Sequence, residues 1–407
     1  MSVMVRHVRI CMETSLRISR GILTGITDYL RLHGGWKLSY TAGGWLEQRI
    51  PASESFDGVI ARVTSSSLAR DLVAFSGPIV LCDPSDVYLA PNHPLAHSSV
   101  VANDYAHCGR LAAEHFLACG YRHFAFVGPT LASSPGLRYD ESPRTEPNWS
   151  RERREGFCAR LAMGGFSAET YQPAATELRT TADKSSRRRL IAWLSKLPKP
   201  VGILAAHDAR GVQVVEACAE AGLSVPYEVG VLGVNGDPLL CATCEPALSS
   251  VTIDAVSAGF RAAEILNGLM NGNRNSRERF VYPAIKVDAA GSTGDVHSED
   301  PIIRQALETI RSRPLAEVHP DALAKDVGLS RRGLELKFSH TVGRGIAAVI
   351  RDEALARARR LVTETNAPLK EIANTCGIAT ASHLAKLFRQ TYGQTMTETR
   401  QAARRER

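Results

Sequence analysis

Short apolar runs alternate with stretches of helical spacing from residue 5 to about residue 290. In Ile18–His33, for example, Ile22, Ile26, Tyr29 and Leu30 recur at steps of three and four residues, which predicts an amphipathic helix. Short apolar strands that alternate with such helices are typical of parallel sheets covered by helices on both faces. The expected strands are Val8–Met12, Gly58–Ala61, Ile79–Leu81, Val100–Ala102, Phe124–Val127, Gly202–Ala205 and Val229–Gly233. Further expected helices are Tyr105–Cys119, Arg151–Met163, Lys184–Leu197, Gly211–Ala221 and Val256–Met270.

The pattern changes after residue 290. Residues 291–300 (GSTGDVHSED) are small, polar and rich in turn formers, which predicts a linker. Residues 301–407 hold no convincing strand pattern and are rich in Ala, Leu, Arg and Glu, which predicts an all-helical domain of a size that one core supports. We therefore expect an α/β domain over residues 1–290, a linker over 291–300 and a helical domain over 301–407.

Basic charge is concentrated in this last quarter of the chain. The 407 residues have an ordinary globular composition, with 44% hydrophobic and 22% charged residues and a net charge of +7. From residue 301 onward there are 19 Lys and Arg and 11 Asp and Glu, whereas the first 300 residues carry 30 basic and 31 acidic groups. This asymmetry favours a nucleic-acid partner, with a solvated basic tail as the alternative. Because no apolar run has membrane length and Met1–Met12 lacks a signal-peptide core, we expect a cytoplasmic protein without a membrane partner.

Two helix-turn-helix patterns lie in the helical domain. The first is Leu323-Ala324-x3-Gly328-Leu329-Ser330, and the second, 49 residues later, is Ile372-Ala373-x3-Gly377-Ile378. A small Ala lets the two helices approach closely, and Gly permits the positive φ of the tight turn. In the first pattern, Ser330 is placed to cap the following helix.

Each pattern leads into an expected recognition helix. The first, about Ser330–His340, would bury Leu334 and Phe338, and the second, about Thr380–Thr391, would bury Leu384, Leu387 and Phe388. Between them, Ile346–Thr363 predicts one long basic helix, which would hold the two units about one DNA turn apart. The side chains left to face outward are Arg331, Arg332, Glu335 and Lys337 in the first helix and Thr380, Ser382, His383, Lys386 and Arg389 in the second.

Residues 301–401 resemble the AraC-type DNA-binding domain, including the ending Phe388-x3-Tyr392-Gly393-x-Thr395 followed by Arg400. The chain departs from that family at Met396, where Pro is usual, and at Thr399, where an aromatic residue is usual. The resemblance implies base reading by Arg331, Arg332 and Glu335 and then by Thr380, Ser382, His383 and Lys386, with Arg389 also facing DNA. It further implies a double-stranded DNA operator, a homodimer on repeated half-sites and, if the protein activates transcription, contact with RNA polymerase. A helical protein-interaction bundle is the alternative.

Most of residues 5–290 resemble the sugar-sensing domain of the LacI/GalR type, which is periplasmic-binding-protein-like and two-lobed. Val100-x2-Asn103-Asp104-Tyr105 and the stretch from Ala112 to Gly128 carry the resemblance, as do Arg153-x2-Gly156-Phe157, Ala206-His207-Asp208, Val225-Pro226-x2-Val229-Gly230-Val231-Leu232-Gly233 and Leu248-Ser249-Ser250-Val251. A sensor of this type that precedes an AraC-type module is similar to regulators of pentose use. The similarity implies a D-xylose-like pentose that binds between the lobes and changes DNA binding when they close.

The same resemblance points to five ligand-binding candidates. Arg153, Asp208 and Asn235 are the main ones, because Arg forks donate pairs of hydrogen bonds to sugar hydroxyls and Asp and Asn accept them. The family usually has Asp where Asn235 stands, a loss for which Asp237 is placed to compensate, and Trp149 supplies an aromatic wall or a lid. Other roles stay open: Arg153 pairing with a surface carboxylate, and Asp208 capping the helix that starts near Ala209. For Asp104, capping of Tyr105–Cys119 is the expected role, while Glu13, Arg20 and Arg62 are weaker candidates for the cleft.

Two other functions compete with a sugar-responsive regulator. A sensor for a sugar phosphate or a nucleoside is one, since Arg151, Arg153 and Arg154 offer a small cationic cluster for a phosphate. An α/β enzyme is the other, but the chain has no G-x-S-x-G, P-loop or G-x-G-x-x-G motif in the required place. The His residues show no metal-ligand spacing, and Cys241-x2-Cys244 has no second pair of ligands nearby. We therefore expect no cofactor, no metal and no catalytic residues.

Overall fold

The computed structural model describes residues 5–43, 48–63, 65–130, 146–171, 173, 184–272, 277–294, 300–342 and 345–405. The chain forms two compact units, unit 1 over Met1–Gly294 and unit 2 over Asp295–Arg407. The stretch expected as a linker therefore begins inside unit 1. There Ser292 is fully buried, and its hydroxyl donates to the backbone oxygen of Val231 at 2.6 Å.

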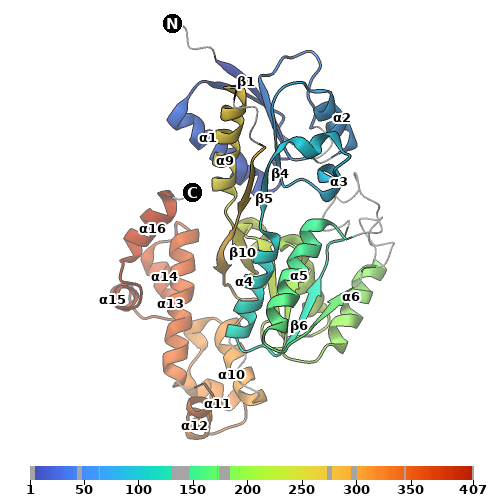
Figure 1. Ribbon diagram of the computed structural model, residues 1–407. Helices are drawn as coiled ribbons and strands as arrows, with labels where there is room; N and C mark the ends of the chain where they lie inside the picture. The colour runs from blue at the N-terminus through green and yellow to red at the C-terminus, as the bar shows by residue number, and fades with distance from the viewer. Residues whose placement is uncertain are drawn as a thin grey trace. The chain divides into compact units, whose positions relative to one another are not determined.

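Unit 1 contains two six-stranded sheets, each the centre of one lobe (Figure 1). The sheet of lobe 1 has the order β11-β5-β4-β3-β1-β2, and that of lobe 2 has the order β12-β10-β9-β8-β6-β7. All pairs are parallel except β12, which runs antiparallel to β10. The strands of lobe 1 are β1 (Arg6–Cys11), β2 (Trp36–Tyr40), β3 (Gly58–Ala61), β4 (Ile79–Cys82), β5 (Ser99–Asn103) and β11 (Arg279–Tyr282). Those of lobe 2 are β6 (His123–Val127), β7 (Ala168–Tyr171), β8 (Val201–Ala205), β9 (Val229–Asn235), β10 (Ser249–Ile253) and β12 (Ala284–Asp288).

Helices of both lobes connect these strands. Lobe 1 has α1 (Arg17–His33), α2 (Ser66–Ala74), α3 (Asp86–Leu89), the 3-10 turn η1 (Pro94–His97) and α9 (Ala255–Met270). Lobe 2 has α4 (Tyr105–Ala118), α5 (Asn148–Ala162), α6 (Lys184–Lys196), α7 (Asp208–Glu220) and α8 (Pro238–Cys241). The chain passes between the lobes three times, from β5 to α4, from β10 to α9 and from β11 to β12. Neither lobe is therefore a continuous segment of the chain.

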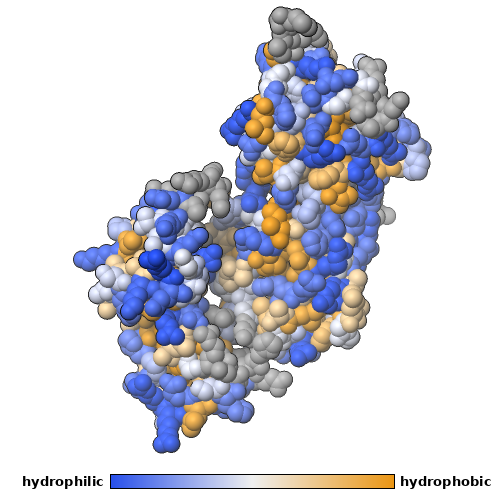
Figure 2. Space-filling model, turned by 60° about the vertical axis from the view of Figure 1, so that its left-hand side comes forward, coloured by the Kyte–Doolittle hydropathy of each residue, from blue (hydrophilic) through white to orange (hydrophobic). Residues whose placement is uncertain are grey.

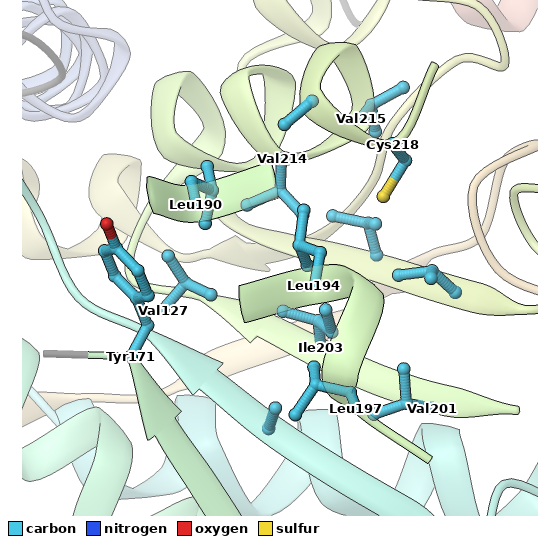
Figure 3. Packing of buried hydrophobic residues seen from close by; sticks show 14 of the residues in the cluster. Val127, Tyr171, Leu190, Leu194, Leu197, Val201, Ile203, Val214, Val215 and Cys218 are labelled. Atoms are coloured by element: carbon cyan, nitrogen blue, oxygen red, sulfur yellow. The ribbon is translucent and has the colours of Figure 1, made fainter. Parts of the chain in front are cut away.

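The core of lobe 2 lies where α6 and α7 cover one face of its sheet (Figure 3). Leu194 of α6, Val214 of α7 and Ile203 of β8 are fully buried there. Burying a side chain of this size contributes about 1.5–3 kcal/mol relative to leaving it exposed. The parallel strands thus need the near-continuous apolar sequence from which they were predicted.

Close helix pairs cover the inner part of each lobe. In lobe 2, α4 packs on α5 through Gly109 and Gly156, where a Cβ atom would lie 2.1 Å from the backbone oxygens of Arg153 and Ala106 respectively. In lobe 1, α1 packs on α9 through Gly25 and Gly259 in the same manner. Since real Cβ atoms do not come this close to another atom, only glycine permits these helix–helix distances.

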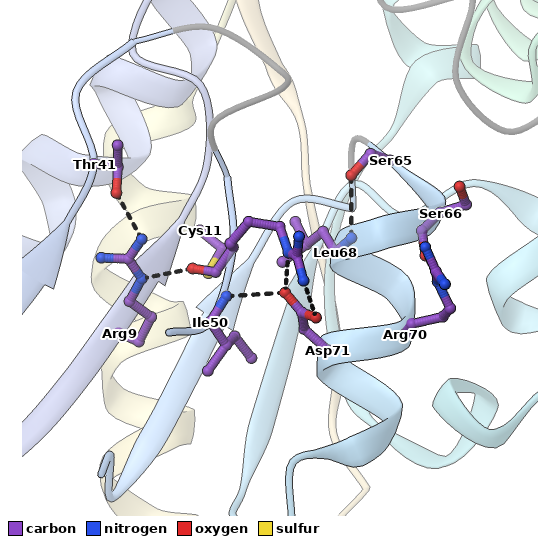
Figure 4. Close-up of polar contacts among 10 residues, drawn as sticks. Arg9, Cys11, Thr41, Ile50, Ser65, Ser66, Leu68, Arg70 and Asp71 are labelled. Atoms are coloured by element: carbon purple, nitrogen blue, oxygen red, sulfur yellow. Dashed lines mark hydrogen bonds and ion pairs between the residues drawn. The ribbon is translucent and has the colours of Figure 1, made fainter. Parts of the chain in front are cut away.

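Polar contacts fix the outer part of lobe 1 (Figure 4). The Arg9 guanidinium on β1 donates to the backbone oxygen of Arg49 at 3.0 Å and to the Thr41 hydroxyl at 2.7 Å. Arg49 in turn forms a two-bond ion pair with Asp71 of α2 at 2.5 and 2.9 Å. The buried guanidinium of Arg9 thus holds Thr41 and Arg49 in place beside β1.

All regular secondary structure among the described residues of unit 2 is helical. It consists of α10 (Pro301–Ser312), the 3-10 turn η3 (Leu315–Glu317), α11 (Pro320–Asp326), α12 (Arg331–Val342), α13 (Ile346–Glu364), α14 (Leu369–Thr375), α15 (Ala381–Tyr392) and α16 (Met396–Arg405). Leu334, Phe338, Leu384 and Phe388 are fully buried, as their spacing predicted. Leu387, which was expected to be buried as well, is only half-buried. On the face seen in Figure 2, hydrophilic residues cover most of the surface of both units and apolar residues form small groups.

All seven apolar runs expected as strands are strands, but five further strands were not predicted. Four of these, β2, β7, β11 and β12, are the edge strands of the two sheets and are partly exposed. The fifth, β10, is fully buried but has the sequence SSVTI, so that its Ser and Thr side chains hide it from an apolar pattern. Strand β12 also breaks the expected parallel arrangement.

Candidate functional site

The carboxyl ends of the central strands bring polar side chains together in both lobes. In lobe 2, His207 and Asp208 follow β8, and Asn235 ends β9. In lobe 1, Glu13 follows β1 and Arg62 follows β3. Ligands of open α/β sheets bind outside the carboxyl ends of the strands, so these residues mark a candidate ligand site.

Arg153 of α5 lies at the centre of the lobe 2 group. The residue is only 3% exposed. Because Gly109 of α4 has no Cβ atom, α4 can lie close to the backbone oxygen of Arg153, which fixes α5 at this position. One terminal nitrogen donates to the Ala206 oxygen at 2.6 Å and the other to Asn235 Oδ1 at 3.0 Å. Its guanidinium carbon lies 5.3 Å from the ring centre of Trp149 and 5.5 Å from that of Tyr105. No surface carboxylate of the described residues pairs with it, so that alternative role of Arg153 is wrong.

His207, rather than Asp208, caps helix α7. The helix begins at Asp208, and His207 Nδ1 accepts the backbone N–H of Arg210 at 3.3 Å, so the alternative in which Asp208 caps the helix is wrong. Burial, together with nearby Arg153 and Arg210, lowers the pKa of His207 to about 3. The imidazole is therefore neutral at pH 7, and its hydrogen sits on Nε2, which is buried without a partner in the described structure.

Asp208 links three strand ends of lobe 2. Its carboxyl oxygens accept the backbone N–H of Asp237 at 2.7 Å and the Ser250 hydroxyl at 2.5 Å. Burial raises the pKa of Asp208 to about 7, although these two hydrogen bonds oppose the shift. The residue is 1% exposed, and its carboxyl group holds the segments that carry Asp237 and Ser250 in place around the site.

Asn235 receives hydrogen bonds from both lobes. Its φ of 111° is unusual for a residue other than glycine, and such strain is typical of functional sites. Arg153 donates to its side-chain oxygen, and Arg17, at the start of α1 in lobe 1, donates to its backbone oxygen at 2.9 Å. Arg17 was not among the sequence candidates, because nothing in the chain pattern shows that α1 begins opposite β9.

Asp237 and Trp149 complete the group of five candidates. Asp237 caps α8 by accepting the N–H of Leu239 at 3.1 Å, and it pairs with Arg20 of α1 at 3.5 Å. Its carboxylate is therefore engaged by Arg20. Trp149 packs against His207, with ring centres 5.7 Å apart. The structure thus brings Arg153, Asp208, Asn235, Asp237 and Trp149 around the ends of β8 and β9.

Lobe 1 supplies the opposite wall. Glu13 is fully buried and pairs with Arg62, and Glu13 Oε2 has no further partner in the described residues. Although burial opposes it, the Glu13 carboxylate, together with Asp83, raises the pKa of Arg62. Asp83, with a φ of 46°, accepts the Tyr282 hydroxyl at 2.6 Å. Glu13 and Arg62 were weak candidates and Asp83 was not predicted, because each is a single polar residue after an apolar run.

The expected cationic cluster of Arg151, Arg153 and Arg154 does not act as one group. Arg151 of lobe 2 pairs with Asp86 of lobe 1 at 2.7 Å, and Arg154 pairs with Glu146 at 2.9 Å.

As predicted, Asp104 caps α4 by accepting the N–H of His107 at 2.7 Å. No group of three His, Cys, Asp or Glu that would hold a metal ion occurs among the described residues, and Cys241 simply ends α8.

The two helix-turn-helix units of unit 2 have the predicted form. Gly328 and Gly377 adopt φ values of 72° and 67° in the turns before α12 and α15. Ser330 accepts the N–H of Gly333 at 3.1 Å, and Thr380 accepts that of His383 at 3.1 Å, so that both recognition helices are capped. The cap occupies one lone pair of the Thr380 hydroxyl, and its hydrogen stays available as a donor.

Most of the expected DNA-facing side chains are exposed. They are Arg331, Arg332, Thr380, Ser382, His383, Lys386 and Arg389, while Glu335 is half-buried. Lys386 and Arg389 also line a surface hollow with Ala385, Gln390 and Thr395. Arg331 pairs with Asp321 at 3.0 Å, and Lys337 is engaged by Asp300 at 2.5 Å. Leu336, which sequence reasoning passed over as an apolar residue, is 66% exposed on α12.

The last helix keeps its start despite the unusual Met396. Thr395 and Glu398 form a reciprocal cap, in which Glu398 accepts the N–H of Thr395 at 2.7 Å and Thr395 accepts that of Glu398 at 3.2 Å. Met396 is buried, and Arg400 donates to the Ala367 oxygen at 2.7 Å. Arg400 thus holds α16 near the end of α13.

Comparisons with known protein families divide the chain in the same way. Residues 113–293 match the periplasmic binding protein-like domain, and residues 323–402 match a helix-turn-helix domain. None of the helices in the described ranges is long and apolar enough to cross a membrane.

Individual relatives match across most of their length. The xylose operon regulatory protein of Escherichia coli K12 is 30% identical over 344 residues, which are 84% of this chain and 83% of that protein. The protein of the same name from Haemophilus influenzae is 28% identical over 304 residues, or 75% of each chain. A solved structure of a xylose-binding transcription activator superposes with a TM-score of 0.77 at 26% identity and covers 98% of each chain. A LacI family regulator from Enterococcus faecium with bound ribose shares the fold of unit 1, with a TM-score of 0.53 at 18% identity over 71% of this chain and 99% of that one.

Proposed function

The chain belongs to the family of the xylose operon regulatory proteins, and from this premise we propose that a small pentose, such as D-xylose, controls its binding to DNA. It is accordingly a DNA-binding transcription regulator and not an enzyme. The observation that carries the pentose proposal is the convergence of Arg153, Asn235 and Trp149 at the ends of two strands. Guanidinium and amide groups bind sugar hydroxyls, and an aromatic face packs on the C–H surface of the ring.

Movement of the lobes connects the sugar to DNA. Arg17 and Arg20 of lobe 1 contact Asn235 and Asp237 of lobe 2, so these contacts connect the two lobes beside the site. A sugar bound there would favour one arrangement of the lobes by its differential affinity for it. The new arrangement would reposition unit 2 on a double-stranded operator, and we propose that this occurs in a homodimer in the cytoplasm, in contact with RNA polymerase where transcription is activated.

On the DNA side, the exposed residues of α12 and α15 are the proposed contacts. Arg331, Arg332 and Glu335 would read bases through α12. The residues of α15 that would face DNA are Thr380, Ser382, His383, Lys386 and Arg389. Arg pairs bidentately with guanine and Lys neutralises phosphate, so the two kinds of contact differ in their dependence on base sequence and on salt.

The test is a thermal-unfolding screen of the full-length protein against pentoses, hexoses, sugar phosphates and nucleosides, followed by operator binding with and without the responding compound. A ligand at 100 times its Kd adds about 2.7 kcal/mol to the stability of the unit that binds it. We expect D-xylose or a near epimer to raise the Tm of unit 1 and to change the affinity for DNA.

The variant Arg153→Ala should lose this response, because the guanidinium at the centre of the site is removed. The matched control is Arg160→Ala on the same helix, since the ion pair that Arg160 forms with Glu114, at 3.0 Å, is partly exposed. A response to nucleosides alone would disprove a sugar effector, and full sugar affinity in a folded Arg153→Ala protein would remove Arg153 from the site.

A further inference from the structure

Leu336 is the one large apolar side chain of unit 2, among the residues whose burial is described, that lies mostly in solvent. It is 66% exposed and stands in the middle of α12. Leu334 and Phe338, each two residues away, are fully buried. Because successive residues of an α-helix are about 100° apart, a residue midway between two such buried residues projects from the opposite side of the helix. Leu336 therefore lies at the centre of the outward face of α12.

This outward face is the one that a recognition helix places in the major groove. Arg332 precedes Leu336 by one helical turn on the same face and is exposed as well. Ser330, which accepts the N–H of Gly333 at 3.1 Å, fixes the start of the helix just before them. Although isolated exposed apolar residues are ordinary on protein surfaces, Leu336 thus stands where contact with base edges is expected.

The second helix-turn-helix unit has a cation at the equivalent position. In both units the buried Leu and Phe follow the capping residue, Ser330 or Thr380, by four and eight residues. The residue six positions after the cap is Leu336 in α12 and Lys386 in α15, and both are exposed. A lysine there can neutralise a phosphate or donate to a base, whereas a leucine can do neither. The two recognition helices therefore present different chemistry from the same place.

The chemistry of the major groove limits what a leucine can recognise. Base pairs present hydrogen-bond donors and acceptors there, and the C5-methyl group of thymine is the apolar group among them. Contact of a leucine with that methyl group removes apolar surface on both sides from water. Contact with the edge of a G·C pair instead covers polar atoms without giving them a hydrogen bond, which is unfavourable. Leu336 is thus suited to thymine and unsuited to a G·C pair.

We propose that Leu336 contacts the C5-methyl group of a thymine in the major groove and makes α12 selective for a T·A pair in the half-site that it reads. The contact depends on the proposed function, because α12 must enter the groove for it to form. Lys386, at the equivalent position of α15, contributes affinity that depends on salt and not on a methyl group. The first unit then supplies a base preference that the second unit lacks at this position.

The experiment begins with the selection of binding sequences from a random DNA library by the full-length protein. Each thymine of the selected duplex is then replaced singly by deoxyuridine, which removes only the methyl group, and affinity is measured by fluorescence anisotropy. We expect one such replacement to weaken wild-type binding about fourfold, the effect of one buried methyl group, and to have no effect on binding by Leu336→Ala. The matched control is Leu32→Ala, since Leu32 of α1 is 73% exposed in unit 1. This control should keep the wild-type response.

Leu336→Lys provides a second readout, because it gives α12 the side chain that α15 has at this position. It should abolish the discrimination between thymine and uracil at the same base and raise the slope of affinity against log salt by about one.

Three outcomes would overturn the proposed contact. If every uracil replacement weakens Leu336→Ala and the wild type equally, Leu336 touches no thymine methyl group, and DNA binding by α12 still stands. If those responses are equal and Leu336→Ala also changes the oligomeric state in sedimentation, the leucine is a contact with a second copy of the chain. Failure of the full-length protein to select any DNA sequence would overturn the proposed function together with this contact.

Discussion

In unit 2 the side chains expected to contact DNA are mostly exposed and lie on two 12-residue helices, α12 and α15. In unit 1 the bonded pair at the centre of the ligand site, Arg153 and Asn235, is separated by 82 residues and Arg153 is buried. A local, exposed site needs only a stable helix with the right surface. A buried, assembled site depends on the packing of every element that contributes to it. The two units should therefore respond differently to substitutions away from their functional side chains.

The largest difference is expected for close helix packing. Gly156→Ala places a Cβ atom 2.1 Å from the Ala106 oxygen, so we expect a loss of about 3 kcal/mol in the stability of unit 1 and a displaced Arg153. Gly328→Ala in unit 2 meets no atom within 4 Å and should cost only about 1–2 kcal/mol, from its positive φ. Chemical denaturation of the full-length protein measures both. Gly268→Ala, a helix position with open space, is the control and should be neutral or stabilising. Equal losses for Gly156→Ala and Gly268→Ala would show that the close approach of α4 and α5 is not required.

The next effect is the dependence of stability on pH, which should differ in sign between the buried neighbours Asp208 and His207. The raised pKa of Asp208, about 7 when folded against 3.8 when unfolded, stabilises the fold at pH 4 and loses this contribution as the pH rises through 7. The lowered pKa of His207, about 3 against 6.5, acts in the opposite direction and stabilises the fold above pH 6.5. As the pH rises from 4 to 8, the free energy of unfolding of Asp208→Asn should therefore increase relative to that of the wild type. That of His207→Gln should decrease relative to the wild type over the same range. Urea unfolding at intervals of pH measures both slopes, and parallel curves for the two variants would contradict the assignment. Unit 2 has no such buried pair among its described residues, so its transition should not follow these slopes.

A DNA contact should change affinity with little effect on stability or sugar binding. Lys386→Ala removes an exposed cation of α15, so we expect operator affinity to fall about tenfold and the slope against log salt to decrease by about one. Fluorescence anisotropy at several salt concentrations measures both quantities. Lys196→Ala removes the same charge from an exposed position in unit 1 and serves as the control. If the two variants lose affinity equally, net charge alone drives binding and the placement of α15 in the groove is wrong.

The smallest effect concerns the cap of the second recognition helix. Thr380→Ala removes the acceptor for the His383 N–H and should cost about 1 kcal/mol, without any DNA present. Hydrogen exchange of the amides in the first turn of α15 should then become faster. Thr391→Ala, near the exposed end of the same helix, leaves this cap intact and should not change exchange there. Unaltered exchange in Thr380→Ala would mean that the cap does not hold the turn.

The apolar pattern predicted the buried strands because residues such as Val59 and Ile203 must leave water wherever they pair. It failed for β2 and β12, where one side of the strand meets solvent and the sequence becomes mixed. It failed for β10 because Ser249 and Ser250 are buried by hydrogen bonding, with Thr293 and Asp208 as their partners, rather than by apolar contact.

The candidate sites follow the same division. Helical spacing was sufficient to predict that Arg332 and Lys386 are exposed, because exposure depends only on the face of one helix. Arg153 was also predicted as a candidate, but its hydrogen bonds to the oxygens of Ala206 and Asn235 were not, since they depend on how the elements of the lobe pack. Arg17 was missed because its contact with Asn235 spans 218 residues and both lobes.

The three passages of the chain between the lobes have a consequence for synthesis on the ribosome. Strand β11 and helix α9, which complete lobe 1, are translated after almost all of lobe 2, and β12 completes lobe 2 still later. Neither lobe can therefore finish folding early, and the nascent chain holds two unfinished sheets at once. Because unit 2 follows β12 in the sequence, a ribosome that has made the recognition helices has already made every strand of the sensor. A translation product that stops early thus lacks the means to occupy the operator, and no truncated regulator that ignores its signal can arise in this way.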